Sequence, residues 1–126
     1  MSSKIPEGYH TITPYLIVKN AAAFIEFTQK VFNAELLLKH MRDETIIMHA
    51  EIKIGGDSII MFADSTEEYA PKPASFFIYV QDADSTYENA LQNGATAVIK
   101  MSDQSYGRSG GVEDAFGNTW WITTVI

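Results

Sequence analysis

The feature that most constrains the fold is one strand-to-helix pattern that occurs twice in a chain of 126 residues. "LIVKNAAAFIEF" (residues 16–27) and "IYVQDADSTYEN" (residues 78–89) each pass from a β-prone segment through a capping residue into a helix start. Further along, "FNAE" matches "NGAT" at almost the same offset. Two strand-to-helix starts can look alike by chance, but three extended segments follow each of these helices. The pattern therefore indicates one supersecondary unit used twice, because each copy is too small to bury its own hydrophobic face.

The first copy begins with "TITPYLIV" (residues 11–18), whose β-branched and aromatic residues predict a strand. Asn20 is expected to cap the following helix, which should end near Asn33. Apolar residues recur within this helix at steps of three and four, as one buried helical face requires: Phe24, Phe27 and Val31. Three apolar segments then predict an antiparallel meander: residues 35–40, 45–54 and 57–63.

The second copy follows a polar segment with two prolines, "DSTEEYAPKPA", which is typical of a linker. After it we expect a strand, a helix capped by Asp82 or Asp84, and three more strands. The sequence thus predicts a single α+β domain, residues 1–126, of two tandem βαβββ modules whose curved mixed sheets surround a cleft. Its parts are module 1 (about 10–63), a linker (about 64–74) and module 2 (about 75–126).

Composition excludes several classes of partner. A formal net charge of -7 with only nine Lys and Arg is the opposite of the clustered positive charge that binds nucleic acid. The absence of cysteine removes disulfides, thiolate metal ligands and a cysteine nucleophile, which suits a reducing cytoplasm. "MSSKIPEGYH" lacks the apolar core of a signal peptide, and nowhere do ~18 apolar residues run together. We therefore expect a cytoplasmic protein without a membrane or nucleic-acid partner.

Three segments carry a resemblance to a known family: "TPYL", "MHAEI" and "EDAFGNTWWI", in this order along nearly the whole chain. With the two βαβββ units, they resemble the vicinal oxygen chelate superfamily, which contains glyoxalases, bleomycin-resistance proteins and extradiol dioxygenases. The resemblance is closest to its PhnB-like branch, although Ala115 stands where that branch usually has proline. It implies the glyoxalase/bleomycin-resistance fold, with "EDAFGN" as the turn between the last two strands and Gly117 and Asn118 at its corner.

"GRSGG" (residues 107–111) matches the GxSxG spacing of a nucleophile elbow. That motif needs a strand before it and a helix after it, whereas an extended "VEDA" follows here. A phosphate-binding loop is excluded as well, since no helix start and no Lys-Ser/Thr pair follow. The segment therefore predicts no hydrolase or nucleotide site.

The resemblance also implies a metal site, because metal enzymes of this superfamily carry one His or Glu on the first and last strand of each unit. The matching positions in this chain are Thr13, Met61, Ser75 and Trp121. Hydroxyl, thioether and indole groups cannot supply the imidazole and carboxylate donors that a divalent cation prefers. We therefore predict no cofactor and no metal at this position, and a divalent metal elsewhere is disfavoured.

Strand alternation predicts which side chains line the cleft. In residues 46–54 the even-numbered Ile46, Met48, Ala50, Ile52 and Ile54 should face the helix, leaving Ile47, His49, Glu51 and Lys53 opposite. His49 and Glu51 could then form an acid–base pair, or belong to a solvated face or an interface. The predicted ligand-binding side chains are Thr13, Tyr15, Met61, Ser75, Phe77, Tyr79, Arg108, Thr119 and Trp121.

Two of these side chains carry a specific expectation. Trp121 should lie on the cleft wall, while Trp120 faces the helix side. Arg108 either closes over an anionic ligand or forms a salt bridge with Asp103 or Asp114. A wall of this kind suits an apolar or aromatic ligand, although the same aromatics could also close the core.

Two function hypotheses follow. One is a metal-free small-molecule binding protein of the bleomycin-resistance type, with its ligand in a cleft between the modules. The alternative is a glyoxalase-like lyase or isomerase that uses His49 and Glu51 as an acid–base pair or as displaced metal ligands. Open sheet edges and an apolar lining also predict a homodimer.

Overall fold

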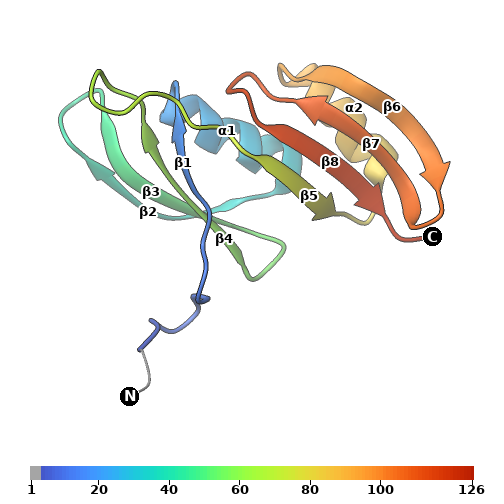
Figure 1. The fold of residues 1–126 in the computed structure, drawn as a ribbon, viewed down its shortest axis with the longest axis horizontal. Coiled ribbons are helices and arrows are strands. Elements are labelled where there is room, and N and C mark those ends of the chain that lie inside the picture. Colours follow the sequence, from blue (N-terminus) through green and yellow to red (C-terminus); the bar gives the residue numbers. More distant parts are fainter. Residues whose placement is uncertain (1–3) are drawn as a thin grey trace.

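The computed structural model describes residues 4–126, and the predicted strand, helix and three strands occur in it twice (Figure 1). The first copy comprises β1 (Tyr15–Val18), α1 (Ala21–Phe32), β2 (Glu35–Met41), β3 (Ile47–Ile54) and β4 (Ser58–Asp64). The second comprises β5 (Ser75–Tyr79), α2 (Ala83–Gln92), β6 (Thr96–Gln104), β7 (Gly107–Glu113) and β8 (Thr119–Thr124). Residues 1–3 of the predicted domain lie outside the described residues.

Each copy builds one four-stranded mixed sheet, which confirms the predicted fold class. The first sheet has the order β1-β4-β3-β2 and the second the order β5-β8-β7-β6. In both sheets the first strand is parallel to the last one, and the other pairs are antiparallel. Tyr15 lies opposite Met61 in the first sheet, and Phe77 lies opposite Trp121 in the second. The two sheets therefore share the same strand order and strand directions.

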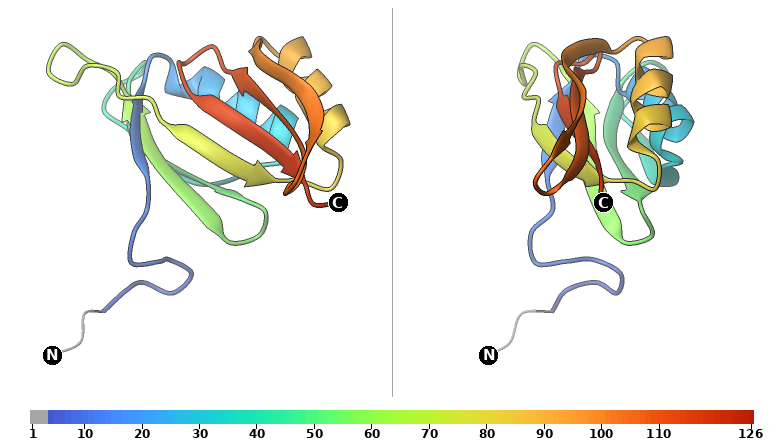
Figure 2. Two further views of the ribbon diagram at one scale, coloured as in Figure 1. Left: turned by 45° about the vertical axis from the view of Figure 1, so that its right-hand side comes forward. Right: turned by 90° about the vertical axis from the view of Figure 1, so that its right-hand side faces the viewer.

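Both helices cover the same side of the molecule (Figure 2). The Asn89 side chain of α2 donates a hydrogen bond to the backbone carbonyl of Lys30 in α1, over 2.8 Å. The core fills the space between helices and sheets, and the burial of each large apolar side chain there contributes about 1.5–3 kcal/mol to the free energy of folding. Its largest fully buried apolar side chains are Trp120, Phe24, Phe62, Leu16, Ile52 and Ile122. Among the described residues, no helix is long and apolar enough to cross a membrane.

The helix ends follow the predicted capping residues. The Asn20 side chain accepts a hydrogen bond from the Ala23 N–H at 3.1 Å. At the other end of α1, Asn33 is the C-cap and adopts the left-handed conformation. Of the two cap candidates for α2, Asp82 is the cap, because its carboxylate accepts from the Ser85 N–H at 3.1 Å. Asp84 instead lies in the first turn of the helix.

One strand is shorter than predicted, and another contains the "GRSGG" segment. β1 starts at Tyr15 rather than at residue 11, so Thr13 precedes the sheet. β7 starts at Gly107, which places the whole "GRSGG" segment in a strand. Ser109 in that segment is buried and hydrogen-bonded to the Thr123 hydroxyl at 2.8 Å. The exclusion of a nucleophile elbow is thereby confirmed.

The predicted alternation in residues 46–54 is wrong at its first end. Ile47 is buried, with 2% of its surface exposed, whereas Met48 is 56% exposed. The reason is a register shift between β2 and β3, where His40 pairs with His49 but Met41 pairs with Ile47. This bulge inserts Met48 as an extra residue and turns it away from the helix side. From His49 onward the predicted alternation holds, and Ala50 and Ile52 are fully buried.

Candidate functional site

A chain of hydrogen bonds crosses the face of the first sheet that points away from the helices. The Tyr15 hydroxyl contacts His49 Nδ1 at 2.9 Å, and His49 Nε2 contacts a Glu51 carboxylate oxygen at 2.8 Å. The other carboxylate oxygen accepts a hydrogen bond from the hydroxyl of Tyr9, in the N-terminal segment. Tyr15 and Glu51 both pair with Met61, which places them in one row across the sheet. The fold thus joins four side chains from three separate segments.

The charge state of Glu51 sets the direction of these hydrogen bonds. Burial by itself would raise the Glu51 pKa, but the hydrogen bonds from Tyr9 and His49 and the positive charge of His49 and His40 outweigh it and lower the pKa. The carboxylate is therefore ionised and can only accept hydrogen bonds. When the imidazole is neutral, His49 then carries its single proton on Nε2, and its Nδ1 accepts from the Tyr15 hydroxyl. Burial and the Glu51 charge raise the pKa of Tyr15, so this hydroxyl keeps its proton.

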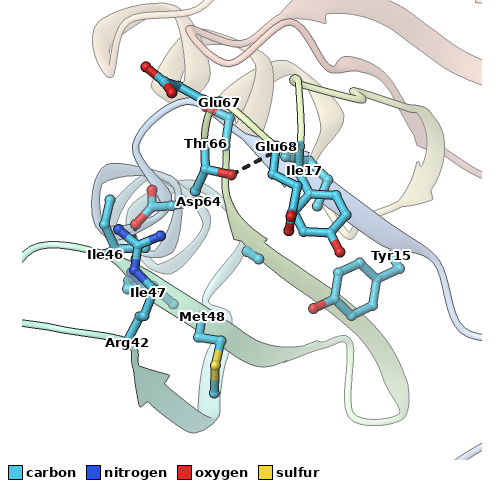
Figure 3. Close-up of a pocket in the computed structure, with 13 residues that line it drawn as sticks. Tyr15, Ile17, Arg42, Ile46, Ile47, Met48, Asp64, Thr66, Glu67 and Glu68 are labelled. Carbon is cyan, nitrogen blue, oxygen red and sulfur yellow. Dashed lines mark hydrogen bonds between the residues drawn. The ribbon is translucent and has the colours of Figure 1, made fainter.

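Beside this hydrogen-bonded chain lies a cavity of about 850 Å³. Figure 3 shows Tyr15 with its hydroxyl end turned toward Met48, and Arg42 and Asp64 at the opposite end. The cavity wall is completed by residues that follow β4, among them Glu68. Asp64 has a structural role, because its carboxylate accepts from the backbone N–H groups of Ala21 and Ile47, both at 2.7 Å. The cavity therefore combines aromatic, thioether and charged groups.

The second sheet exposes aromatic side chains on the corresponding face. Phe77 is 49% exposed and Tyr79 66%, and their ring centroids lie 5.2 Å apart. Tyr106, in the turn between β6 and β7, lies 6.0 Å from Phe77. We call Phe77, Tyr79, Tyr106 and Trp121 the aromatic face. An exposed cluster of this kind is unusual on a surface that contacts only water.

The two adjacent tryptophans lie on opposite sides of β8, as the alternation predicts. Trp120 is 1% exposed, and its ring stacks on Phe76 at 4.4 Å. Trp121 is partly exposed and pairs with Phe77 and with Gly111. A Cβ atom on Gly111 would lie 2.6 Å from the Trp121 ring, so the ring rests directly on the strand backbone. The glycine at this position thus leaves space for the indole.

The "EDAFGN" turn joins β7 and β8, as expected, and is structural. Buried Asp114 accepts hydrogen bonds from the backbone N–H groups of Phe116 and Asn118, both at 2.9 Å. It also accepts from Asn118 Nδ2 at 3.0 Å and from Trp120 Nε1 at 2.8 Å. Gly117 has a φ of 88°, which confirms the expected left-handed corner there. Nothing in the sequence pattern indicated that Asp114 anchors both the turn and the buried Trp120.

Arg108 lies apart from the other predicted ligand-binding residues. Its guanidinium donates to the Asp84 carboxylate at 2.9 Å and to Asp103 at 3.2 Å. Of the two expected salt-bridge partners, Asp103 is correct. Asp114 is wrong, because it is occupied in the turn, and Asp84 at the start of α2 takes its place. Arg108 is therefore held on the helix side of the second sheet and does not close over the aromatic face.

The remaining predicted residues are distributed over both modules. Phe77 and Tyr79 line a second cavity, of about 450 Å³, between the β3–β4 hairpin, β5 and the N-terminal segment. Tyr15 lines the larger cavity of the first sheet. Three more lie in the sheets next to these residues: Met61, Ser75 and Thr119. Sequence patterns did not indicate Tyr9 or Tyr106, because neither lies in a periodic segment whose alternation shows which face of a sheet a side chain occupies.

The four positions that the resemblance matched to metal ligands are a poor donor set in three dimensions too. Thr13 precedes the first sheet, and Trp121 is a neighbour of Phe77. Met61 lies between Tyr15 and Glu51 in the sheet, so Glu51 is the one carboxylate of the described residues that pairs with any of these positions. Among residues 4–126, no three His, Cys, Asp or Glu side chains lie close enough to hold a metal ion. The residues therefore do not fit a divalent metal at the expected position.

Comparison with known proteins places these features in a family. The model of the Glyoxalase/Bleomycin resistance protein/Dioxygenase superfamily matches residues 8–122. An uncharacterized protein of Mycobacterium bovis is 31% identical over 120 residues, covering 86% of this chain and 79% of that one. A putative 3-demethylubiquinone-9 3-methyltransferase, PhnB protein, from Bacillus cereus has a similar structure, with a TM-score of 0.75, 19% identity, and coverage of 92% of this chain and all of that chain.

A third similar protein is TnmS3, an antibiotic binding protein from Streptomyces sp. CB03234. Its structure matches with a TM-score of 0.72 at 14% identity, covering 94% of this chain and 97% of that one. At such identities the two structural matches establish a shared fold.

Proposed function

The chain belongs to the Glyoxalase/Bleomycin resistance protein/Dioxygenase superfamily, and we propose that it is a small-molecule binding protein of the bleomycin-resistance type. Its ligand is an apolar or aromatic compound, held on the aromatic face and in the adjoining space between the two modules. The protein needs no metal for this, since stacking and one or two hydrogen bonds supply the affinity.

The observation that carries this proposal is the exposure of the aromatic face. Phe77 and Tyr79 are 49% and 66% exposed, although their burial would be favourable. Phe77 also lines the cavity of about 450 Å³, so a ligand stacked on it has space to extend between the modules. TnmS3, which shares the fold, is an antibiotic binding protein. Function differs widely among proteins of one fold, so the side chains of this chain are what support the proposed ligand class.

Ligand binding can be measured by tryptophan fluorescence against a panel of planar aromatic compounds. We expect a saturable change for at least one compound, because the Trp121 indole is partly exposed on the aromatic face. Trp121→Ala should weaken binding by ~1–3 kcal/mol, the usual loss for an aromatic anchor in a binding site. Calorimetry measures ligand binding by the wild type and by Trp121→Ala without relying on the removed indole.

Trp120→Ala is the matched control. This side chain is buried, so its removal should lower stability by about 3–5 kcal/mol and affect binding only through the folded fraction. The proposal fails if no aromatic compound binds. It also fails if binding is lost in folded Trp120→Ala protein while Trp121→Ala binds as the wild type does.

The open aromatic face also supports a homodimer. A second copy that covers Phe77, Tyr79 and Tyr106 would remove their apolar surface from water, and two-fold pairing is the commonest way to do so. The ligand space would then be completed by the partner chain.

A second candidate function is acid–base catalysis at His49 and Glu51. It is favoured by the 2.8 Å contact between the two side chains and by the burial of Glu51, which is 5% exposed. In such a lyase or isomerase, His49 would move the proton and Glu51 would stabilise the imidazolium. If turnover of any compound from the panel is found, His49→Gln should abolish it while leaving binding to the aromatic face intact.

A further inference from the structure

The large cavity beside the first sheet is distinct from the aromatic face, and the proposed function does not use it. Tyr15 and Met48 lie on one of its sides, and the segment after β4 forms another. This segment is fixed by its own hydrogen bonds. The Ser65 N–H donates to the Val18 carbonyl at 2.8 Å, and the Thr66 N–H donates to the Tyr69 carbonyl at 2.9 Å. This side of the cavity is therefore formed before a ligand arrives.

The hydrogen-bonded chain behind Tyr15 determines what its hydroxyl can offer to a ligand. With a neutral imidazole whose single proton on Nε2 is donated to the Glu51 carboxylate, the Tyr15 hydroxyl proton is donated to His49 Nδ1. Tyr9 donates to the second Glu51 oxygen, so both carboxylate oxygens are engaged. What remains at Tyr15 is an oxygen lone pair. A ligand group that hydrogen-bonds to this atom must therefore be a donor.

The charges around the cavity restrict the donor further. Figure 3 shows Glu68 directed toward the part of the cavity where Tyr15 lies, whereas Glu67 points outward. Among the described residues that line the cavity, Arg42 is the only basic one, and it forms an ion pair with Asp43 over 3.2 Å. The Tyr15 ring, and that of Tyr69 in the same lining, add aromatic faces that attract a cation.

We propose that this cavity is a binding site for an ammonium-bearing organic compound, such as a primary amine with an apolar body. The ammonium group donates a hydrogen bond to the Tyr15 oxygen and lies near the Glu68 carboxylate, while the apolar body contacts Met48 and the tyrosine rings. Tyr9, Glu51 and His49 keep the Tyr15 proton directed toward His49, so the Tyr15 oxygen is left to accept a hydrogen bond from the ligand. This site is independent of ligand binding on the aromatic face.

The first test measures the hydrogen-bond direction itself. In ¹⁵N-labelled protein at neutral pH, NMR spectra of the His49 imidazole should show a proton on Nε2 and a bare Nδ1. A proton on Nδ1 would overturn the proposal, because Tyr15 would then accept from His49 and offer its own proton to the ligand.

The second test compares three naphthalene probes of nearly equal apolar area by calorimetry. They are 2-naphthylmethylamine, which is an ammonium ion at neutral pH, 2-methylnaphthalene, and 2-naphthoate. We expect the amine to bind roughly ten-fold more tightly than 2-methylnaphthalene, the amount that a charge-assisted hydrogen bond contributes. The naphthoate should bind more weakly than either. Equal binding of amine and 2-methylnaphthalene would refute the proposal.

Variants locate the binding site of the amine. Tyr15→Phe should remove most of the ten-fold preference for the amine and leave 2-methylnaphthalene unaffected. Glu68→Gln should weaken the amine a few-fold, more at low salt than at high salt. Tyr106→Phe is the control, since it makes the same change on the aromatic face. An amine preference that survives Tyr15→Phe and is lost in Tyr106→Phe would place the compound on the aromatic face, overturning this site but leaving the proposed function intact.

Discussion

Replacing Asp114 with alanine should destabilise the protein strongly, because this carboxylate satisfies several donors at once. Three of them are buried: the backbone N–H and Nδ2 of Asn118, and Nε1 of Trp120. A buried donor without a partner costs about 1–3 kcal/mol, so the three together would cost about 3–9 kcal/mol in a rigid turn. Water can enter the vacated space and satisfy part of this demand, which favours the lower end, about 3–5 kcal/mol.

A loss of this size is a large part of the ~5–15 kcal/mol that stabilises an ordinary domain. It is measured as the free energy of unfolding in urea, followed by circular dichroism. Glu113→Ala is the control, because the neighbouring residue is exposed and should change stability by less than about 0.5 kcal/mol. If Asp114→Ala costs less than about 1 kcal/mol, the turn does not depend on this carboxylate and the structural interpretation of "EDAFGN" is wrong.

Three further predictions follow from the site. EDTA should leave the melting temperature unchanged, because the residues at the expected metal position are poor ligands; a clear decrease that zinc, nickel or manganese restores would contradict this. Sedimentation at micromolar concentration should give a dimer, whereas only a 14.0 kDa species would exclude the homodimer. Because the Glu51 pKa is lowered in the folded state, Glu51→Gln should be less stable than the wild type at neutral pH. The difference in unfolding free energy should narrow below about pH 4, where the carboxyl group becomes protonated. A difference that does not depend on pH would indicate that the ionised carboxylate is not what stabilises the fold.

The fold was predictable because local signals repeat in the right order. Asn20 and Asp82 are effective caps at equivalent positions, and each precedes one helix followed by three strands. The alternation that separates Trp120 from Trp121 was equally local, since it depends only on the period of a regular strand. Such features need no knowledge of distant contacts.

Features that depend on contacts between segments were not predictable. The bulge at Met48 arises from the pairing of β2 with β3, and nothing in the sequence near Met48 reveals it. Arg108 pairs with Asp84, which lies 24 residues away, because the start of α2 packs beside β7. Tyr9 reaches Glu51 from outside every periodic segment. Strand alternation predicted that His49 and Glu51 share one face of the sheet. The hydrogen bonds that connect them to Tyr9 and Tyr15 could be recognised only in the folded structure.

In the proposed function, the aromatic face of the second sheet binds the ligand. This binding is tested most directly by a crystal structure of the protein with a compound selected by the fluorescence screen. We expect ligand density in contact with Phe77 and Trp121, with the ring system stacked on at least one of these side chains and extending toward the space between the modules. Density that lies elsewhere, while Phe77, Tyr79 and Trp121 face only solvent or a partner chain, would contradict the claim.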